Sequence, residues 1–263
     1  MRVVWLVAFA LIGCGRLGFD AVAQNGSAGA DAAGDGKAIV DGPPGDVPAA
    51  LVLSGIVFHC DMDADPAATT SLVCEPPAYS GPCVGACPAL AAGHIGNALA
   101  LDGATDQATL PSSLFTTNAA YSVAVWVMPT PGAGNGTVLA KPFSTASDIE
   151  LFSLIVDAVG GVLWGTTATG TSQDYNADQT QNLRDGAWHH IAVVWTGSSK
   201  VLYIDGMLKV SAPATVLGGM QPLQFGVDLH SNAPLWRYSG RIDELQVYSR
   251  ALSLAEVGML AGQ

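Results

Sequence analysis

The sequence is poor in basic residues and in charge as a whole. Lys and Arg number 10 of 263 residues against 22 Asp and Glu, and charged residues make up only 12% of the chain. The formal net charge of −12 argues against nucleic-acid binding, because contacts to phosphate need clustered Lys and Arg. The same deficit argues against electrostatic attachment to anionic lipid. An acidic chain does leave room for a divalent cation.

Familiar catalytic motifs are missing too. The chain holds no G-x-S-x-G, S-x-x-K or H-E-x-x-H pattern and no G-x-x-x-x-G-K phosphate loop, which are signatures of several enzyme classes. Its long apolar run near the start, residues 3–12, has only ten residues, too few to span a bilayer core of roughly 30 Å. After the basic Arg2, such a run is typical of a signal peptide.

The apolar run ends in Leu11-Ile12-Gly13-Cys14. This tetrapeptide resembles a bacterial lipobox, with an aliphatic residue three positions before a cysteine and a small residue directly before it. The resemblance implies that residues 1–13 are removed and that Cys14 is acylated, which would anchor the protein to the bacterial cell envelope, at the outer membrane. An ordinary signal peptide with a chance cysteine is the alternative.

A linker is predicted between the cysteine and the folded part. Residues 14–50, and above all residues 20–50, are dominated by Ala, Gly, Asp and Pro and contain few residues able to form a core. Such a composition cannot bury enough apolar surface to offset the entropy lost on ordering. We therefore expect a disordered tether over residues 14–50 and a folded domain over residues 51–263.

Four cysteines remain after Cys14, namely Cys60, Cys74, Cys83 and Cys87. An even number in an exported chain predicts two disulfide bonds. Zinc is the less favoured reading, because no C-x-x-C pair occurs. The spacing leaves three connectivities open.

The folded part reads as strands separated by turns. Glycine and proline are frequent, with 31 and 15 residues, and apolar β-branched runs recur about every ten residues, which favours an all-β sandwich or jelly roll. Asp205-Gly206 predicts a two-residue hairpin turn, and Ser253 with Glu256 predicts a capped short helix. The predicted strands cover residues 55–60, 98–101, 121–128, 138–140, 149–156, 162–167, 188–195, 201–204, 207–210, 223–227 and 242–248.

Five segments occur in a telling order: GNALALDG (96–103), YSVAVWV (121–127), DGAWHHIAV (185–193), LYIDG (202–206) and GRIDELQVYSRALS (240–253). Together they resemble the laminin-G-like jelly roll of the concanavalin A-like lectin/glucanase superfamily. The resemblance implies a two-sheet antiparallel sandwich, often with calcium, that binds glycans or proteins. Fold alone does not fix the ligand.

A calcium site is predicted from the acidic residues. Asp61, Asp63 and Asp65 alternate, so an extended chain would place them on one face, where a hard cation would relieve their repulsion. Asp243 shares strand parity with residues 245 and 247 and is therefore predicted to point inward. In the related jelly rolls, acidic residues on the first and last strands often hold calcium. We therefore expect Asp61 or Asp63 to join Asp243; an acidic rim, with Asp243 bonded to backbone amides, is the alternative.

The predicted ligand-binding residues are Trp236, Arg237 and Tyr238, which combine flat apolar surface with a forked donor. Tyr175 is a further aromatic candidate near a loop, whereas Trp164 is expected in the core. Adjacent strand residues face opposite sides, so His189 and His190 are interpreted as packing residues.

An enzyme is not expected. Glutamate occurs only at positions 75, 150, 244 and 256, and none lies in the Glu-x-Asp-x-Glu arrangement of jelly-roll glucanases. Asp243 and Glu244 are adjacent and so unsuited to paired acid and nucleophile chemistry. The sequence therefore predicts a non-catalytic, surface-exposed lipoprotein that recognises carbohydrate, with protein–protein adhesion or envelope assembly as the alternative and glycan degradation as a third class. No oligomeric state is predicted.

Overall fold

Two antiparallel sheets build the domain in the computed structural model, which describes residues 54–144, 148–230 and 233–263. All of these residues belong to one compact unit. The predicted signal peptide, Cys14 and the tether over residues 14–50 lie outside the described residues. The eight-stranded sheet consists of β14 (Met207–Pro213), β13 (Ser199–Ile204), β12 (His189–Trp195), β7 (Tyr121–Pro129), β18 (Ser239–Tyr248), β5 (Asn97–Asp102) and β4 (Ala89–Ala92), with β1 (Ile56–Cys60) also paired to β18.

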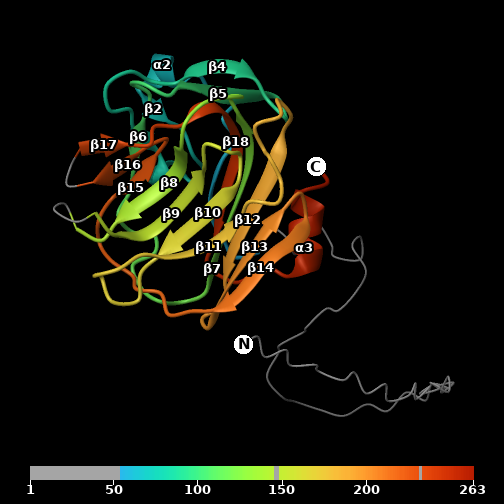
Figure 1. The fold of residues 1–263 in the computed structure, drawn as a ribbon. Coiled ribbons are helices and arrows are strands. Elements are labelled where there is room, and N and C mark those ends of the chain that lie inside the picture. The colour runs from blue at the N-terminus through green and yellow to red at the C-terminus, as the bar shows by residue number, and fades with distance from the viewer. Residues whose placement is uncertain (1–53, 145–147, 231–232) are drawn as a thin grey trace, which may run out of the picture. The chain divides into compact units, whose positions relative to one another are not determined.

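The second large sheet has six strands and lies against the first (Figure 1). Its strands are, in spatial order, β11 (Asp174–Asp178), β10 (Val162–Thr166), β9 (Glu150–Val156), β8 (Gly136–Pro142), β15 (Leu223–Phe225) and β6 (Ala108–Leu110). Two small hairpins complete the strands: β2 (Ser71–Leu72) with β3 (Gly81–Pro82), and β16 (Asp228–His230) with β17 (Ala233–Leu235). The predicted all-β sandwich is confirmed.

The main core fills the space between the two sheets. Val125 and Ile191 of the larger sheet and Phe152, Leu154 and Trp164 of the smaller one are almost completely buried in it. Because side chains alternate along a strand, the residues between these core positions face outward. This alternation decides which side chains of β9, β10 and β11 reach the outer surface of the six-stranded sheet.

Helices are few and short within the described chain: α2 (Pro66–Thr69), the 3₁₀ turn η1 (Pro77–Tyr79) and α3 (Leu254–Leu260). Helix α3 covers the outer face of the eight-stranded sheet beside β14 (Figure 1). Its predicted cap is confirmed, since the Ser253 side chain accepts from the Glu256 amide while the Glu256 side chain accepts from the Ser253 amide. None of the helices in residues 54–263 that the structure describes is long and apolar enough to cross a membrane.

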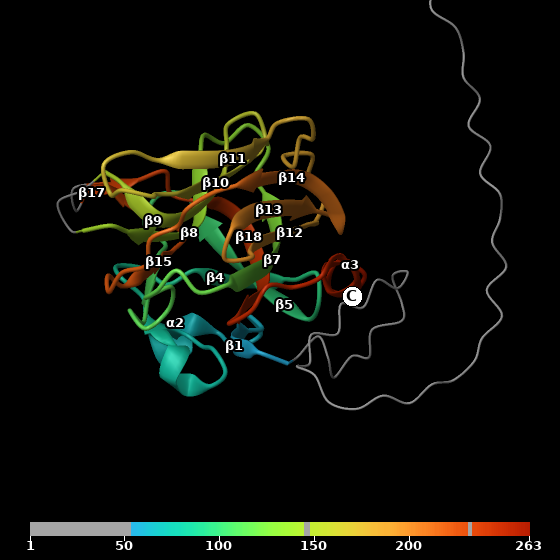
Figure 2. The same ribbon diagram turned by 90° about the horizontal axis from the view of Figure 1, so that it is seen from below.

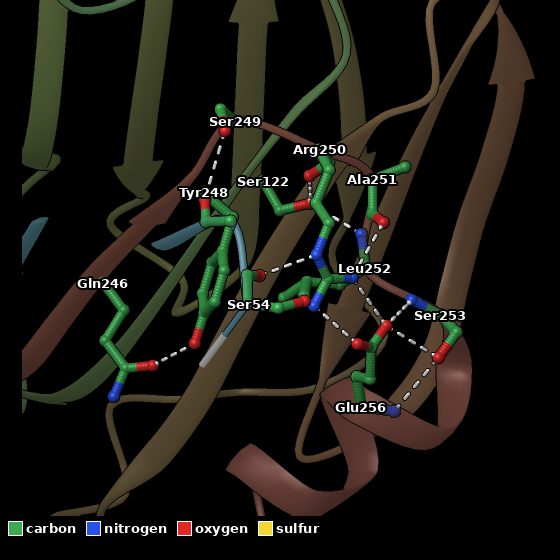
Figure 3. Close-up of polar contacts among 11 residues, drawn as sticks. Ser54, Ser122, Gln246, Tyr248, Ser249, Arg250, Ala251, Leu252, Ser253 and Glu256 are labelled. Atoms are coloured by element: carbon green, nitrogen blue, oxygen red, sulfur yellow. Dashed lines mark hydrogen bonds and ion pairs between the residues drawn. The ribbon is translucent and has the colours of Figure 1, made fainter. Parts of the chain in front are cut away.

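The start of the described chain is tied to the segment before α3 (Figure 3). Arg250 donates to the Ser54 carbonyl at 2.7 Å and pairs with the Glu256 carboxylate at 2.6 Å. The Ser122 hydroxyl bridges the Arg250 carbonyl and the Leu252 amide, both at 2.9 Å. In Figure 2, β1 lies on the side of the domain away from β10 and β11.

The structure contains two disulfides, as predicted. Cys60 bonds to Cys74 and Cys83 bonds to Cys87, which settles the connectivity that the sequence left open. Cys60 and Cys74 are 0% and 2% exposed and belong to the main core.

Candidate functional site

Of the three predicted ligand-binding residues, Tyr238 is placed wrongly by the sequence. Its side chain is 0% exposed and lies in the main core, so its ring cannot stack on a ligand. Trp236 is half-buried and has a left-handed backbone, with φ of +47°. Arg237 is half-buried and bridges to Thr137 at the start of β8. Ligand contact by Trp236 and Arg237 stays a prediction.

The acidic segment after β1 does not alternate on one face. Met62 has a φ of +59° and is 2% exposed, which breaks the extended run, and Asp65 serves as the N-cap of α2 by accepting from the Ala67 amide. Asp61 accepts from the Asp63 amide at 3.2 Å, and Asp63 accepts from the Asn97 amide at 2.6 Å. These carboxylates are used to hold turns.

Asp243 is buried but faces away from the main core, so the predicted direction is wrong. A bulge in β18 between Asp243 and Gln246, with a φ of +50° at Glu244, shifts the alternation by one residue. Asp243 therefore lies opposite Trp126 on the outer face of the eight-stranded sheet. It is 0% exposed beneath the turn that joins β4 and β5.

Backbone amides satisfy the Asp243 carboxylate. It accepts from His94 at 2.8 Å, from Ile95 at 3.0 Å and from Glu244 at 2.9 Å. Burial raises the pKa of Asp243 to about 6, against the opposing effect of these amides. The alternative in which Asp243 binds backbone amides is therefore the one observed.

The predicted calcium ligands Asp61, Asp63 and Asp243 each accept a hydrogen bond from at least one backbone amide. Asp63 and Asp243 already accept from amides of the 93–97 turn. Across residues 54–144, 148–230 and 233–263, as far as these are described, no group of three or more His, Cys, Asp or Glu side chains could hold a metal. Calcium binding by the protein stays a prediction.

The two adjacent histidines pack on opposite sides of β12. His189 lies between Asp205 and Asp185, with its ring nitrogens 3.0 Å and 3.1 Å from their carboxylates. His190 is 2% exposed and its ring meets Trp126 edge to face. The contacts of both histidines therefore help to hold β12 in the sheet.

An exposed tyrosine lies on the outer face of the six-stranded sheet. Ser153, Gly165 and Tyr175 are direct neighbours across β9, β10 and β11. Because Phe152 and Trp164 face the core, this row faces outward. A methyl group at Gly165 would lie 2.7 Å from Tyr175 Cε1, so the Tyr175 ring rests on the β10 backbone, and Tyr175 is 40% exposed.

Two buried carboxyl groups stand beside this ring. Glu150 and Asp228 are 1% and 0% exposed and close enough to share a hydrogen bond. Burial and the Asp228 carboxylate raise the pKa of Glu150 to about 8. Burial, together with Glu150 and Asp228, raises the pKa of Tyr175 to about 12. Tyr175 therefore lies near the carboxyl pair.

Gln173 completes this group, which we call the Tyr175 site (Glu150, Ser153, Gln173, Tyr175 and Asp228). Its Oε1 accepts from the Glu150 amide at 3.0 Å, which orients the side-chain amide. Its Nε2 is buried and has no hydrogen-bond partner among the described residues. A fixed ring, an oriented donor and carboxyl oxygens therefore meet at one place.

Sequence reasoning missed most of the Tyr175 site. The sequence predicts Tyr175 only as an aromatic residue near a loop, because β11 (DYNAD) has no apolar alternation that would indicate a strand. Asp228 is 78 positions from Glu150 in the chain, and no local pattern joins them. The Gly165 position opposite a tyrosine is visible only once the register of β10 and β11 is known.

The chain belongs to the concanavalin A-like lectin/glucanases superfamily. The family model Laminin_G_3 matches residues 102–258, which include β7 to β18 and most of α3. The predicted laminin-G-like resemblance is thereby confirmed.

Individual similar proteins differ in size and setting. A mouse protein with sushi, von Willebrand factor type A, EGF and pentraxin domains is 27% identical over 152 residues, which are 54% of this chain but only 4% of that protein. Domain 4 of AbnA, a GH43 extracellular arabinanase from Geobacillus stearothermophilus solved with arabinotriose, has a TM-score of 0.63 and 24% identity, covering 78% of this chain and 98% of that one. A botulinum neurotoxin serotype D binding domain has a TM-score of 0.59 and 14% identity over 79% of this chain and 50% of that one. These structural likenesses show the fold alone.

Proposed function

We propose that this protein is a non-catalytic carbohydrate-binding lipoprotein that presents its laminin-G-like domain at the bacterial cell surface. The family and the fold support a binding module in general. The choice of carbohydrate over other ligands rests on the Tyr175 site.

The observation that carries the proposal is the exposed Tyr175 ring resting on Gly165. A ring that already rests on backbone loses little freedom when a ligand stacks on it. Sugars combine apolar ring faces with hydroxyl groups, and the half-buried Gln173 side chain lies beside the ring over Gly165, oriented by the bond that it accepts from the Glu150 backbone amide. The structural neighbour solved with arabinotriose supports an oligosaccharide ligand.

The carboxyl pair argues against glycoside hydrolysis. Retaining and inverting glycosidases hold their two carboxyl groups about 5–5.5 Å or about 6.5–9.5 Å apart, with the scissile bond between them. Glu150 and Asp228 are near enough to hydrogen-bond to each other and are almost completely buried, so neither carboxyl group is presented to a substrate at the surface. This supports a non-catalytic role for the pair.

Presentation at the surface is part of the same proposal. Residues 1–13 would act as signal peptide, Cys14 would carry lipid, and residues 14–50 would separate the domain from the membrane. Because β10 and β11 lie away from β1 (Figure 2), the Tyr175 site would face away from the point where the tether joins.

Protein binding is the second candidate, favoured by one observation. Met207 and Leu208 are 57% and 55% exposed on β14, an edge strand of the eight-stranded sheet. An edge strand with exposed apolar side chains is a place where another protein can pair with or cover the sheet.

A glycan array probed with the purified protein, with calcium and again with chelator, tests the proposed function. We expect selective glycan binding that Tyr175→Ala weakens by about tenfold, the effect of about 1.4 kcal/mol. Val159→Ala is the matched control, because Val159 is 66% exposed in the β9–β10 turn. Loss of binding in chelator would support calcium in recognition. A folded protein that binds no glycan would reject carbohydrate in favour of a protein partner.

A further inference from the structure

A second exposed ring lies on the same sheet as Tyr175. Phe143, directly after β8, is 39% exposed. Its backbone amide donates to the Ile149 carbonyl at 2.8 Å, which fixes the end of the β8–β9 connection. This exposed part of the apolar ring contributes nothing to burial on folding and is open to a ligand.

Phe143 also rests on a glycine. Gly170, in the turn between β10 and β11, has a φ of +75°, and a methyl group there would lie 2.5 Å from Phe143 Cζ and 2.7 Å from Cε2. The Phe143 ring is therefore seated on backbone as the Tyr175 ring is seated on Gly165. Gly165 and Gly170 thus each support one ring.

The two rings are too far apart for one sugar. Gly165 pairs with Tyr175 on one side and with Ser153 of β9 on the other, so Tyr175 and Ser153 lie at the same position along the strands. Phe143 is hydrogen-bonded to Ile149 and therefore lies at the position of Ile149. Ser153 and Ile149 are four residues apart, which is about 13 Å at about 3.3 Å per residue. One pyranose or furanose ring cannot lie on both.

The polar residues of the Tyr175 site fall between these positions. Glu150 follows Ile149 directly, and its amide donates to Gln173 two residues before Tyr175. A ligand running along the strands from one ring to the other would therefore pass the half-buried Gln173 side chain, whereas Glu150 and Asp228 lie beneath the surface.

We propose that the ligand is an oligosaccharide of at least three residues, with one sugar on Tyr175 and a later one on Phe143. The inference rests on the proposed function, since it extends the same site. Phe143 then sets the preferred ligand length, while Tyr175 contributes to binding at every length.

Affinities for ladders of arabino-, xylo- and cello-oligosaccharides of one to six residues test this, measured by calorimetry on the full chain. We expect affinity in at least one ladder to rise up to three or four residues and then level off. Phe143→Ala should weaken binding of the hexamer by about tenfold, or about 1.4 kcal/mol, and leave the mono- and disaccharide unchanged. Tyr175→Ala should weaken all lengths, and Val159→Ala none.

The outcomes separate the two proposals. If Phe143→Ala leaves the hexamer affinity unchanged, or if the monosaccharide binds as tightly as the hexamer while Tyr175→Ala still weakens both, the length inference is wrong and carbohydrate binding stands. If the folded wild-type protein binds no member of any ladder and no glycan on the array, the proposed function fails and this inference with it. Circular dichroism of each variant confirms that folding is retained.

Discussion

Several charged side chains are buried in this domain, where they form hydrogen bonds with backbone groups or with another side chain. Lys200 is 0% exposed on β13, and its Nζ donates to the carbonyls of Trp164 and Asp174 at 3.0 Å and 2.9 Å. Burial lowers the pKa of Lys200 to about 8. Asp243 is the negatively charged counterpart, because its buried carboxylate accepts hydrogen bonds from three backbone amides. Buried charge of this kind holds turns in place and need not mark a site.

His189 makes the stability of the domain depend on pH. Hydrogen bonds to Asp205 and Asp185 and their negative charge raise its pKa above 6.5, against the opposing effect of burial. A raised pKa in the folded state means that the protonated ring adds stability below the unfolded pKa of about 6.5 and that this contribution disappears as pH rises through the folded value.

We therefore expect the stability advantage of wild type over His189→Gln to be greater at pH 5.5 than at pH 8.5. Urea unfolding of both proteins at several pH values measures it. A difference that stays constant, or that grows toward pH 8.5, would contradict the assignment of the raised pKa.

At the scale of elements, one arginine joins several connections. Arg184, in the segment between β11 and β12, is 6% exposed. It donates to the carbonyls of Asp157, Thr130, Gly134 and Val156 at 2.5–3.2 Å. The end of β9 and the β7–β8 connection are thereby held by one guanidinium, which only a planar group with several donors can do.

Replacing Arg184 by Lys is expected to lower the free energy of unfolding by about 2–4 kcal/mol, because buried carbonyls lose donors that one ammonium cannot replace. Chemical denaturation measures the change. The control is Arg241→Lys, since Arg241 makes one bond to a carbonyl, that of Ala92 at 3.1 Å, near the surface. Equal losses of unfolding free energy in the two variants would contradict the proposal that Arg184 holds these connections in place.

The strands also show how much of the secondary structure can be predicted from sequence patterns. Strong apolar strands such as β7, β9 and β12 were predicted within one or two residues, because their alternation is dense. Strands β4, β6, β11, β16 and β17 were missed, as they are short or polar and form by pairing with longer neighbours. The bulge at Glu244 was missed for a related reason: it is a feature of pairing between β18 and β7.

For the whole molecule, the two disulfides differ in the loop they close. Cys60–Cys74 joins residues 14 positions apart and Cys83–Cys87 residues 4 apart. In the loop-entropy model these correspond to about 3 and about 2 kcal/mol. The former pair is also buried in the core.

The double variant Cys60→Ala, Cys74→Ala should thus lose more unfolding free energy than Cys83→Ala, Cys87→Ala, by about 1 kcal/mol or more. Thermal and urea unfolding of both, in the absence of reductant, provide the comparison. Equal stability of the two variants would show that loop length and burial do not govern these bonds here.

The sequence by itself determined the all-β sandwich, the superfamily, the number of disulfides and the capped C-terminal helix, because each depends on local alternation, turn residues or short motifs. Only the tertiary structure decided which cysteines pair, that Tyr238 is core, that Asp243 turns away from the core, and that Tyr175 stands beside Glu150 and Asp228. Those outcomes depend on strand register, where one extra residue moves every following side chain to the opposite face.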